Sequence, residues 1–280
     1  MATDPGRRTP TLPDPLPLPV VDNHTHLDIT RDGDPVDVPS ILAAAASVGV
    51  DRLVQIGCDL PGARETIELV KAHPSILGGV ALHPNEAPRL AEQGSLAAAY
   101  EEIEALARHP RVQVVGETGL DYFRTGPEGA GVQQESFRWH IDLAKRLGKT
   151  LQIHDRDSHE DVLRILAEEG APEQVVMHCF SGDLAMAREC VERGYHLSFS
   201  GTVTFKSAKG LRDAVAVTPL GQILVETDAP YLTPHPWRGA TNAPALMPYT
   251  VRALAAGLGI SVPELCLAVT ANSERLYGPW

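Results

Sequence analysis

Short apolar runs rich in β-branched residues alternate with longer helical patterns from Val20 to the end of the chain. This alternation is typical of parallel βαβ units, in which each strand is buried on both faces. It predicts eight strands, at residues 20–23, 52–56, 77–81, 112–116, 150–153, 174–177, 195–199 and 222–225. Helical patterns separate and follow them, for example at residues 62–72, 96–108, 133–147, 158–168, 245–257 and 261–276.

Eight strands with following helices match the strand count of an α/β fold of the closed (β/α)8 type, the TIM barrel. An open doubly wound sheet is the alternative, and it would be expected to carry a glycine-rich phosphate loop after its first strand. Here the first predicted strand runs instead into Asp-Asn-His-Thr-His at residues 22–26. We therefore predict a TIM barrel that forms a single domain over residues 20–280.

The segment before the first strand has a different composition. Residues 1–19 contain prolines at positions 5, 10, 13, 15, 17 and 19 and few apolar anchors. Such a composition predicts an extended, polyproline-like arm that is mobile at its start.

Composition narrows the class of protein. The chain of 280 residues is 43% hydrophobic, and no apolar run approaches the roughly 20 residues of a membrane span. The start lacks a basic region followed by an apolar run, so we expect no secretory signal and a soluble, cytoplasmic protein. Four cysteines without a C-x-x-C pair predict buried, reduced thiols. A net charge of −12 argues against bulk electrostatic coating of nucleic acid, but not against an enzyme that grips one strand end.

Candidate chemistry begins with His24 and His26, which follow the first apolar run two residues apart. Side chains at positions i and i+2 of a strand point to the same face, so both imidazoles can reach one ion. Alone, the pair also fits two solvated loop histidines. The later strands change this picture, because each of four more apolar runs is followed by an ionisable residue: Glu117, His154, His178 and Asp228. The carboxyl ends of barrel strands meet at one rim, so we predict that the six side chains converge there.

Four imidazoles and two carboxylates suit a divalent metal such as Zn, Mn, Mg, Fe or Ni. Six donors are too many for one tetrahedral ion and suit two ions about 3.5–4 Å apart. We assign two groups that share Glu117 as a bridge: His24, His26, Glu117 and Asp228 for the first ion, and Glu117, His154 and His178 for the second. Glu117 and Asp228 are thus the predicted catalytic carboxylates. We expect the metals to activate a water molecule whose proton Asp228 accepts.

Around these residues the sequence resembles the TatD family of metal-dependent deoxyribonucleases, within the amidohydrolase-like barrel superfamily. The segments that carry the resemblance include Asp-Asn-His-Thr-His-Leu-Asp at 22–28, Gly-Glu-Thr-Gly-Leu-Asp-Tyr at 116–122 and Val-Glu-Thr-Asp-Ala-Pro-Tyr-Leu at 225–232, together with residues 81–84, 153–157, 178–182, 198–201, 238–242 and 270–276. The resemblance implies a two-metal barrel hydrolase that removes nucleotides from the 3′ end of DNA or RNA. It also implies that His83 contacts a substrate phosphate.

Three cations are candidates for further phosphate contacts on the rim. Arg156, two residues after His154, is either a phosphate clamp or one half of a surface ion pair. Lys206 and Arg238 follow strands seven and eight and are either phosphate contacts or solvated loop charges. Glu226, two residues before Asp228, should face inward and orient a ligating histidine.

The remaining candidates have structural explanations. His73 and His109 precede prolines at helix ends, where histidine suits the helix dipole. His140 and His159 fall in helical patterns, and we expect both to be solvated. Cys179 adjoins His178 but should point to the opposite face of its strand, which excludes it as a ligand.

Two other functions remain open. One branch of the same family resembles a D-aminoacyl-tRNA deacylase, so the substrate could be an ester or amide instead of a phosphodiester. The other possibility is a non-catalytic metal or nucleic-acid binding protein, which a missing ligand or a basic strip would favour. We expect a DNA or RNA end as the substrate, a monomer without an obligate protein partner, and no association with a membrane.

Overall fold

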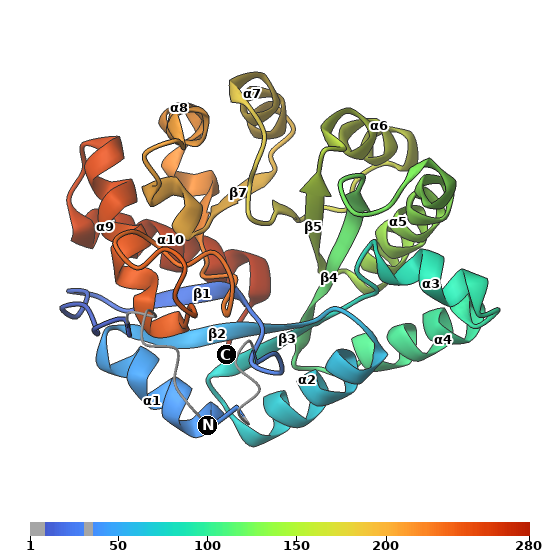
Figure 1. The fold of residues 1–280 in the computed structure, drawn as a ribbon, viewed down its shortest axis with the longest axis horizontal. Helices are drawn as coiled ribbons and strands as arrows, with labels where there is room; N and C mark the ends of the chain where they lie inside the picture. Colours follow the sequence, from blue (N-terminus) through green and yellow to red (C-terminus); the bar gives the residue numbers. More distant parts are fainter. Residues whose placement is uncertain (1–8, 31–35) are drawn as a thin grey trace.

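The protein is described by a computed structural model that covers residues 9–30 and 36–280. Eight parallel strands form one sheet in the order β1 to β8, and the helices surround it on the outside (Figure 1). The predicted (β/α)8 barrel with a single domain is confirmed.

All eight strands lie where the apolar runs predict them. They are β1 (Val20–Thr25), β2 (Val50–Gly57), β3 (Ile76–Val80), β4 (Val112–Asp121), β5 (Thr150–Arg156), β6 (Val175–Met177), β7 (His196–Phe199) and β8 (Ile223–Val225). The helices are α1 (Val38–Ser47), α2 (Leu60–Ala72), α3 (Glu86–Glu92), α4 (Leu96–Ala107), α5 (Pro127–Leu147), α6 (His159–Glu169), α7 (Leu184–Glu192), α8 (Lys209–Val217), α9 (Met247–Leu258) and α10 (Val262–Tyr277). Short 3-10 helices are η1 (Gly201–Thr204), η2 (Leu220–Gln222) and η3 (Pro244–Leu246).

Two strands run well beyond their apolar segments. β4 was predicted to end at Gly116 but continues to Asp121, and β5 continues from Ile153 to Arg156. After a register shift the two strands pair again, from Thr118 opposite Ile153 to Asp121 opposite Arg156. Backbone hydrogen bonds hold this extension, and they do not depend on side-chain polarity. Glu117 therefore lies inside β4 and not after its end.

The barrel closes between β1 and the segment that follows β8. The Asp228 N–H donates to the His24 carbonyl at 3.0 Å, and the His26 N–H donates to the Ala229 carbonyl at 2.8 Å. Buried side chains complete this seam, because Asp22 accepts hydrogen bonds from the backbone N–H and the hydroxyl of Thr227. The closing contacts thus join β1 and the residue after it to the segment that follows β8, and they include the predicted metal ligands His24, His26 and Asp228.

Apolar side chains fill two layers. Residues such as Val54, Val114 and Leu224 pack inside the barrel with Tyr277 from the end of α10. A larger cluster lies between the sheet and the surrounding helices, with Phe137 of α5 as one of its largest buried members. The strands are consequently buried on both faces, as their near-continuous apolar sequence predicts.

The described part of the N-terminal arm lies against the barrel. Leu16 is buried, and its N–H donates to the Val48 carbonyl at 2.9 Å. Side chains of Arg252 and Thr270 donate to backbone carbonyls of Asp14 and Pro19. The predicted mobile start of the arm falls on residues 1–8, which lie outside the described residues.

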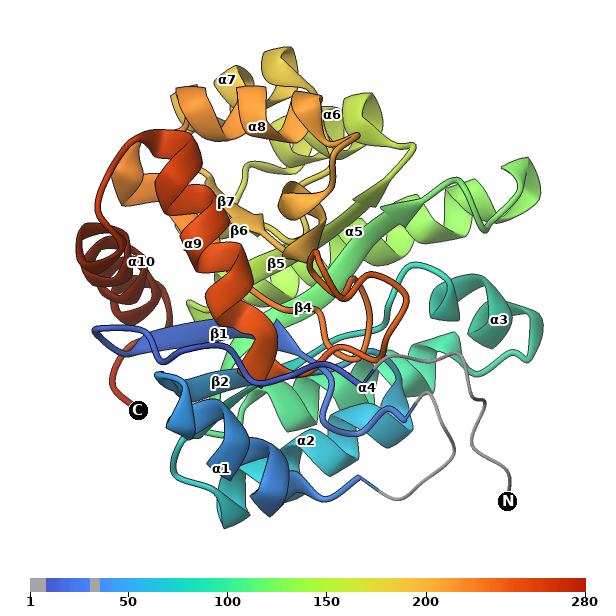
Figure 2. The ribbon, with the colours of Figure 1, turned by 60° about the vertical axis from the view of Figure 1, so that its left-hand side comes forward.

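Helix α10 lies next to β1 and α9 packs against α10, so that late and early segments of the chain meet on one side of the barrel (Figures 1 and 2). No helix within the described ranges is, by itself, long and apolar enough to cross a membrane. The bent pair Pro244–Leu258 and Val262–Tyr277 reaches the required length and apolarity only when the two helices are taken together.

The expectation that His140 is solvated is wrong. Its ring is fully buried on the inner face of α5, where Nε2 accepts a hydrogen bond from the Leu82 N–H at 3.1 Å. Nδ1 lies 2.7 Å from the Ser136 carbonyl. The helical pattern of α5 does not show that the backbone N–H of Leu82, just after β3, will need the His140 ring as its acceptor. His159 is half-buried and lies 2.7 Å from an oxygen of Asp155.

Candidate metal centre

The seam between β1 and β8 brings together the first predicted group of ligands. Nε2 of His26 lies 3.3 Å from Nε2 of His24 and 3.3 Å from Oδ1 of Asp228. Nε2 of His24 is 3.8 Å from the same carboxylate oxygen. Asp228 has a φ of 53°, a left-handed conformation that Asp tolerates better than most residues, and the turn directs its side chain toward the two imidazoles. These three donors can hold one ion.

The second group comes from β4, β5 and the end of β6. Oε2 of Glu117 lies 3.0 Å from Nε2 of His178 and 3.7 Å from Nδ1 of His154. The same oxygen is 3.5 Å from Nε2 of His24, which belongs to the first group. Glu117 therefore faces both groups, as its predicted bridging position requires. The three distances all involve the same oxygen, Oε2.

The donor set fits divalent cations. Among the described residues, the buried atoms Oε2 of Glu117 and Nε2 of His154 face only the neighbouring imidazoles and Asp121, and these contacts leave hydrogen-bonding capacity unused. An unsatisfied buried polar atom carries a desolvation cost of about 1–3 kcal/mol, and a metal ion would remove it. His24, His26, His178 and Glu117 are all buried, so few waters compete for them. Nitrogen and oxygen donors at these separations can hold transition metals.

Burial and neighbouring charges shift the pKa values in opposite directions. Burial would raise the pKa of Glu117, but the imidazole of His178 and hydrogen bonds from His154 and His178 hold it well below its usual range. Burial would lower the pKa of His178, yet Glu226 and Glu117 raise it well above 6.5. The pKa of His154 rises to about 9 against its burial, through hydrogen bonds with Asp121 and Glu117. These shifts favour an ionised Glu117 carboxylate and positive charge on its neighbours His154 and His178.

A second set of groups fixes the orientation of the imidazoles. Nδ1 of His24 lies 2.7 Å from Oε1 of Gln152, and Nδ1 of His26 lies 2.9 Å from the Ile56 carbonyl. Nδ1 of His178 lies 2.9 Å from Glu226, which faces inward as predicted. In each case the other ring nitrogen, Nε2, faces the cluster of candidate ligands. This arrangement is usual for metal-binding histidines.

His83 lies at the edge of the cluster. Its Nε2 is 3.4 Å from Oε1 of Glu117, and its ring packs edge-on against His154 with 4.6 Å between the ring centroids. Burial lowers the pKa of His83 to about 4. A neutral imidazole at this position can donate or accept a hydrogen bond from a substrate.

Sequence reasoning missed three residues that reach the cluster. Asp121 lies 3.4 Å from Nε2 of His154, Cys58 lies 3.5 Å from Oε1 of Glu117, and Gln152 holds His24. Gln152 could have been found, because it is two residues before His154 and shares its face of the strand. Cys58 lies at the end of β2, whereas Cys179 contacts Ser200 and joins no candidate metal cluster in the described part of the chain.

The predicted substrate cations lie at the end of β5 and in the segments that follow β7 and β8. The guanidinium of Arg156 lies over the ring of Phe123, 3.8 Å from its centroid, and has no carboxylate partner among the described residues. Arg238 lies over Phe205 at 4.7 Å. The surface ion pair considered for Arg156 is therefore absent from the described structure, and stacking takes its place.

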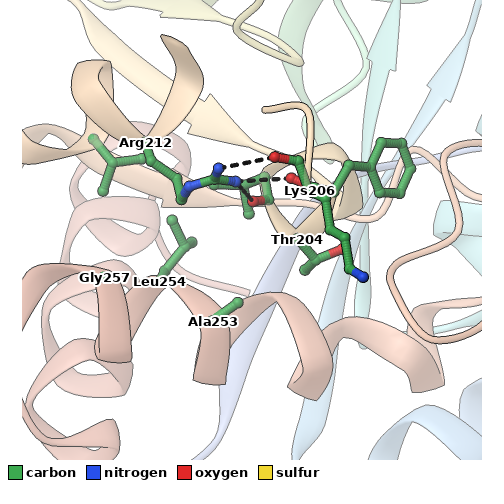
Figure 3. Close-up of a pocket in the computed structure, with 9 residues that line it drawn as sticks. Thr204, Lys206, Arg212, Ala253, Leu254 and Gly257 are labelled. Atoms are coloured by element: carbon green, nitrogen blue, oxygen red, sulfur yellow. Dashed lines mark hydrogen bonds between the residues drawn. The ribbon is translucent and has the colours of Figure 1, made fainter. Parts of the chain in front are cut away.

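Lys206 borders a separate cavity of about 250 Å³ between η1, α8 and α9 (Figure 3). Arg212 donates to the carbonyls of Val203, Phe205 and Lys206, so the backbone after η1 is fixed. Figure 3 shows the Lys206 side chain extending away from that guanidinium. None of the metal-ligand candidates lines this cavity, so its location does not mark the metal centre.

Comparison with known proteins identifies the family of this chain. The family model of TatD-related DNases matches residues 21–278. The chain is 49% identical over 263 residues to the uncharacterized metal-dependent hydrolase TatD of Mycobacterium tuberculosis, covering 92% of this chain and 98% of that protein. It is 38% identical over 260 residues to the uncharacterized metal-dependent hydrolase YcfH of Escherichia coli K12, covering 92% and 95%.

Solved structures agree. The TatD homolog YJJV of Escherichia coli superimposes with a TM-score of 0.84 at 26% identity, covering 93% of this chain and 98% of that one. A TatD family hydrolase of Entamoeba histolytica gives a TM-score of 0.82 at 19% identity, covering 94% and 99%, which supports the fold alone. This chain therefore belongs to the TatD-related DNase family of metal-dependent hydrolases.

Proposed function

We propose that this protein hydrolyses phosphodiester bonds of DNA, and of RNA, with two divalent metal ions, and removes nucleotides from the 3′ end. The observation that carries the proposal is the pair of ligand groups that meet at Oε2 of Glu117. The description of the matching family as DNases supports the substrate class. The polarity of degradation comes from the family resemblance alone.

The ligand groups suggest separate tasks for the residues. His24, His26 and Asp228 would hold one cation, and Glu117, His154 and His178 the other. Two bound cations would lower the pKa of water and polarise the scissile phosphate. Asp228, whose side chain is 14% exposed, would take a proton from the attacking water, and His83, 3.4 Å from Oε1 of Glu117, would contact a phosphate oxygen.

The cations around the centre favour a substrate with several phosphates. Within residues 9–30 and 36–280, the basic side chains that form neither an ion pair nor a hydrogen bond are Arg124, Arg156, Arg188, Lys206 and Arg238. All except Arg188 lie on strand ends or loops at the rim that carries the metal ligands. In a protein with a net charge of −12, unpaired cations gathered on one rim provide local attraction for a polyanion.

These cations would equally serve a tRNA that carries an aminoacyl ester, so D-aminoacyl-tRNA is the second candidate substrate. A non-catalytic binding role is disfavoured by the convergence of all six ligands and by the hydrolase relatives. The ester and phosphodiester substrates differ in the bond broken, and a direct comparison separates them.

The test uses metal-free protein reloaded separately with Zn, Mn, Mg, Fe or Ni. Elemental analysis should give about two ions per chain at saturation. A 5′-labelled single-stranded oligonucleotide should yield a ladder of shortened products, whereas a circular strand of the same sequence should resist. Cleavage of the circle would contradict the exonuclease, and turnover of D-aminoacyl-tRNA at lower enzyme concentration than any oligonucleotide would replace the nuclease with the deacylase.

A further inference from the structure

Phe123 and Arg156 form a stacked pair at the rim. Phe123 lies in the turn that follows β4 and is 63% exposed. The guanidinium of Arg156, at the end of β5, covers one face of its ring at 3.8 Å. A single exposed apolar side chain is common and carries no meaning by itself. This pair differs from such a side chain in three respects: its turn is held by hydrogen bonds, it lies near the candidate metal centre, and it carries an unpaired positive charge.

The turn that carries Phe123 is held by several hydrogen bonds. Asp121 is buried and accepts from the Arg124 N–H at 2.9 Å, and the Thr125 N–H donates to the Asp121 carbonyl at 3.2 Å. The Tyr122 N–H donates to the Arg156 carbonyl at 2.9 Å, which joins the turn to β5. The ring is therefore presented on a preorganised support, which reduces the entropy lost when a ligand binds.

The pair is also tied to the metal centre. Asp121, which anchors the turn, lies 3.4 Å from Nε2 of His154. Arg156 follows His154 by two positions on β5, a separation of roughly 7 Å along an extended strand, and its guanidinium lies over the ring of Phe123. A group that binds over Phe123 would thus belong to a nucleotide close to the one at the metals.

The surroundings define the chemistry of the ligand. An exposed aromatic face offers stacking to any flat ring, and an unpaired guanidinium beside it attracts phosphate. Bases within a duplex are already stacked and cannot lie on the ring. We propose that Phe123 and Arg156 form a subsite that stacks one unpaired nucleobase near the scissile phosphate and so selects single-stranded ends. The proposal rests on the proposed nuclease function and specifies its substrate.

The variants for the test are Phe123→Leu, which keeps an apolar side chain without a ring, and Phe123→Tyr, which keeps the ring. Leu267→Ala is the matched control, because Leu267 on α10 is also 63% exposed. The probes are a labelled single-stranded oligonucleotide and a series of copies, each with one abasic position counted from the 3′ end. Binding is measured by fluorescence anisotropy on metal-free protein, and cleavage rates are measured after metal is restored.

Phe123→Leu should weaken binding of the intact oligonucleotide about 10-fold, since a stacked base contributes on the order of 1–3 kcal/mol. Phe123→Tyr and Leu267→Ala should bind as the unaltered protein does. With the abasic series, the difference between Phe123→Leu and the unaltered protein should vanish at one position only. Metal content should be the same in all variants.

The subsite is refuted if Phe123→Leu binds the intact strand normally, or if its loss of affinity is the same for every abasic position. A change in sedimentation without a change in oligonucleotide affinity would make Phe123 a contact between copies of the chain and would also overturn the subsite. Failure of the nuclease proposal looks different. In that case metal-loaded protein leaves every oligonucleotide intact, while the base-dependent binding still decides the role of Phe123.

Discussion

His154 and His159 stand five residues apart but occupy different environments. The side chain of His154 lies between Glu117 and Asp121. His159 is the first residue of α6, and its partly exposed ring pairs with Asp155. Replacing each histidine by alanine therefore compares the loss of a candidate ligand with the loss of a partly exposed side chain outside the cluster. His154→Ala should lower the hydrolysis rate at least about 100-fold and reduce the number of bound metals. His159→Ala should change the rate less than about threefold. Equal losses in the two variants would exclude His154 as a ligand.

His140 shows how one buried group makes stability depend on pH. Burial lowers its pKa to about 4, whereas a histidine in the unfolded chain titrates near 6.5. Between these values the unfolded state binds a proton that the folded state does not. Folding stability therefore falls as the pH drops from about 6.5 to 4, by up to about 1.4 kcal/mol per pH unit from this group.

His140→Gln should reduce this slope, since an amide cannot be protonated in that range but can still accept from the Leu82 N–H. Urea unfolding at several pH values measures the slope, with His73→Gln as the control because His73 is only half-buried at the end of α2. An unchanged slope in His140→Gln would mean that other groups cause the acid sensitivity.

At the scale of elements, the seam between β1 and β8 couples barrel closure to the metal centre. The hydroxyl of Thr227 donates to buried Asp22 at 2.5 Å. The candidate ligands His24, His26 and Asp228 lie within a few residues of this hydrogen bond along the two segments. Loss of this hydrogen bond leaves a buried oxygen without its partner. The effect should therefore reach both stability and metal affinity.

Thr227→Val should lower the free energy of unfolding by about 1–3 kcal/mol and weaken metal binding. Thr218→Val is the control, because the hydroxyl of Thr218 is also buried and bonded, to the Ala214 carbonyl, but lies away from the seam. Chemical denaturation and metal titration measure the two effects. Equal metal affinity in the two variants would show that the seam does not position the ligands.

At the scale of the whole molecule, we expect the attraction of a polyanionic substrate to follow the uneven distribution of unpaired cations more than the net charge. Most basic side chains are neutralised locally, as Arg146 is by Glu104 and Asp142. Those left without such partners gather at one rim, with Arg188 on α7 as the exception in the described part of the chain. Substrate attraction should therefore depend on position and not on total charge.

Arg156→Ala and Arg188→Ala remove the same charge from different places. Arg156→Ala should make the log–log salt dependence of oligonucleotide binding shallower by about 0.7, the value for one lost phosphate contact on a single strand. Arg188→Ala should leave the slope unchanged. Binding titrations over a range of salt concentrations measure both, and parallel slopes for Arg156→Ala and the unaltered protein would remove Arg156 from the phosphate contacts.

Local pattern was enough to predict the barrel and the residues that converge in it as candidate metal ligands. The alternation of apolar runs and helical periods follows from the burial of each strand on both faces, so it is visible in the chain itself. Polar residues such as His154 and His178 stand out because they directly follow apolar runs in the sequence, and the barrel topology then sends them to one rim. These inferences need only neighbouring residues and one rule of topology.

Tertiary structure decided the rest, because it depends on pairs that are distant in the sequence. The contact of Gln152 with His24 joins β5 to β1, and burial of His140 depends on the end of β3 beside α5. The extension of β4 past Gly116 arises from backbone pairing with β5, which carries no signature in side-chain polarity. Whether a cation such as Arg156 is neutralised, stacked or free likewise depends on which elements pack beside it, and no local pattern in the sequence specifies that packing.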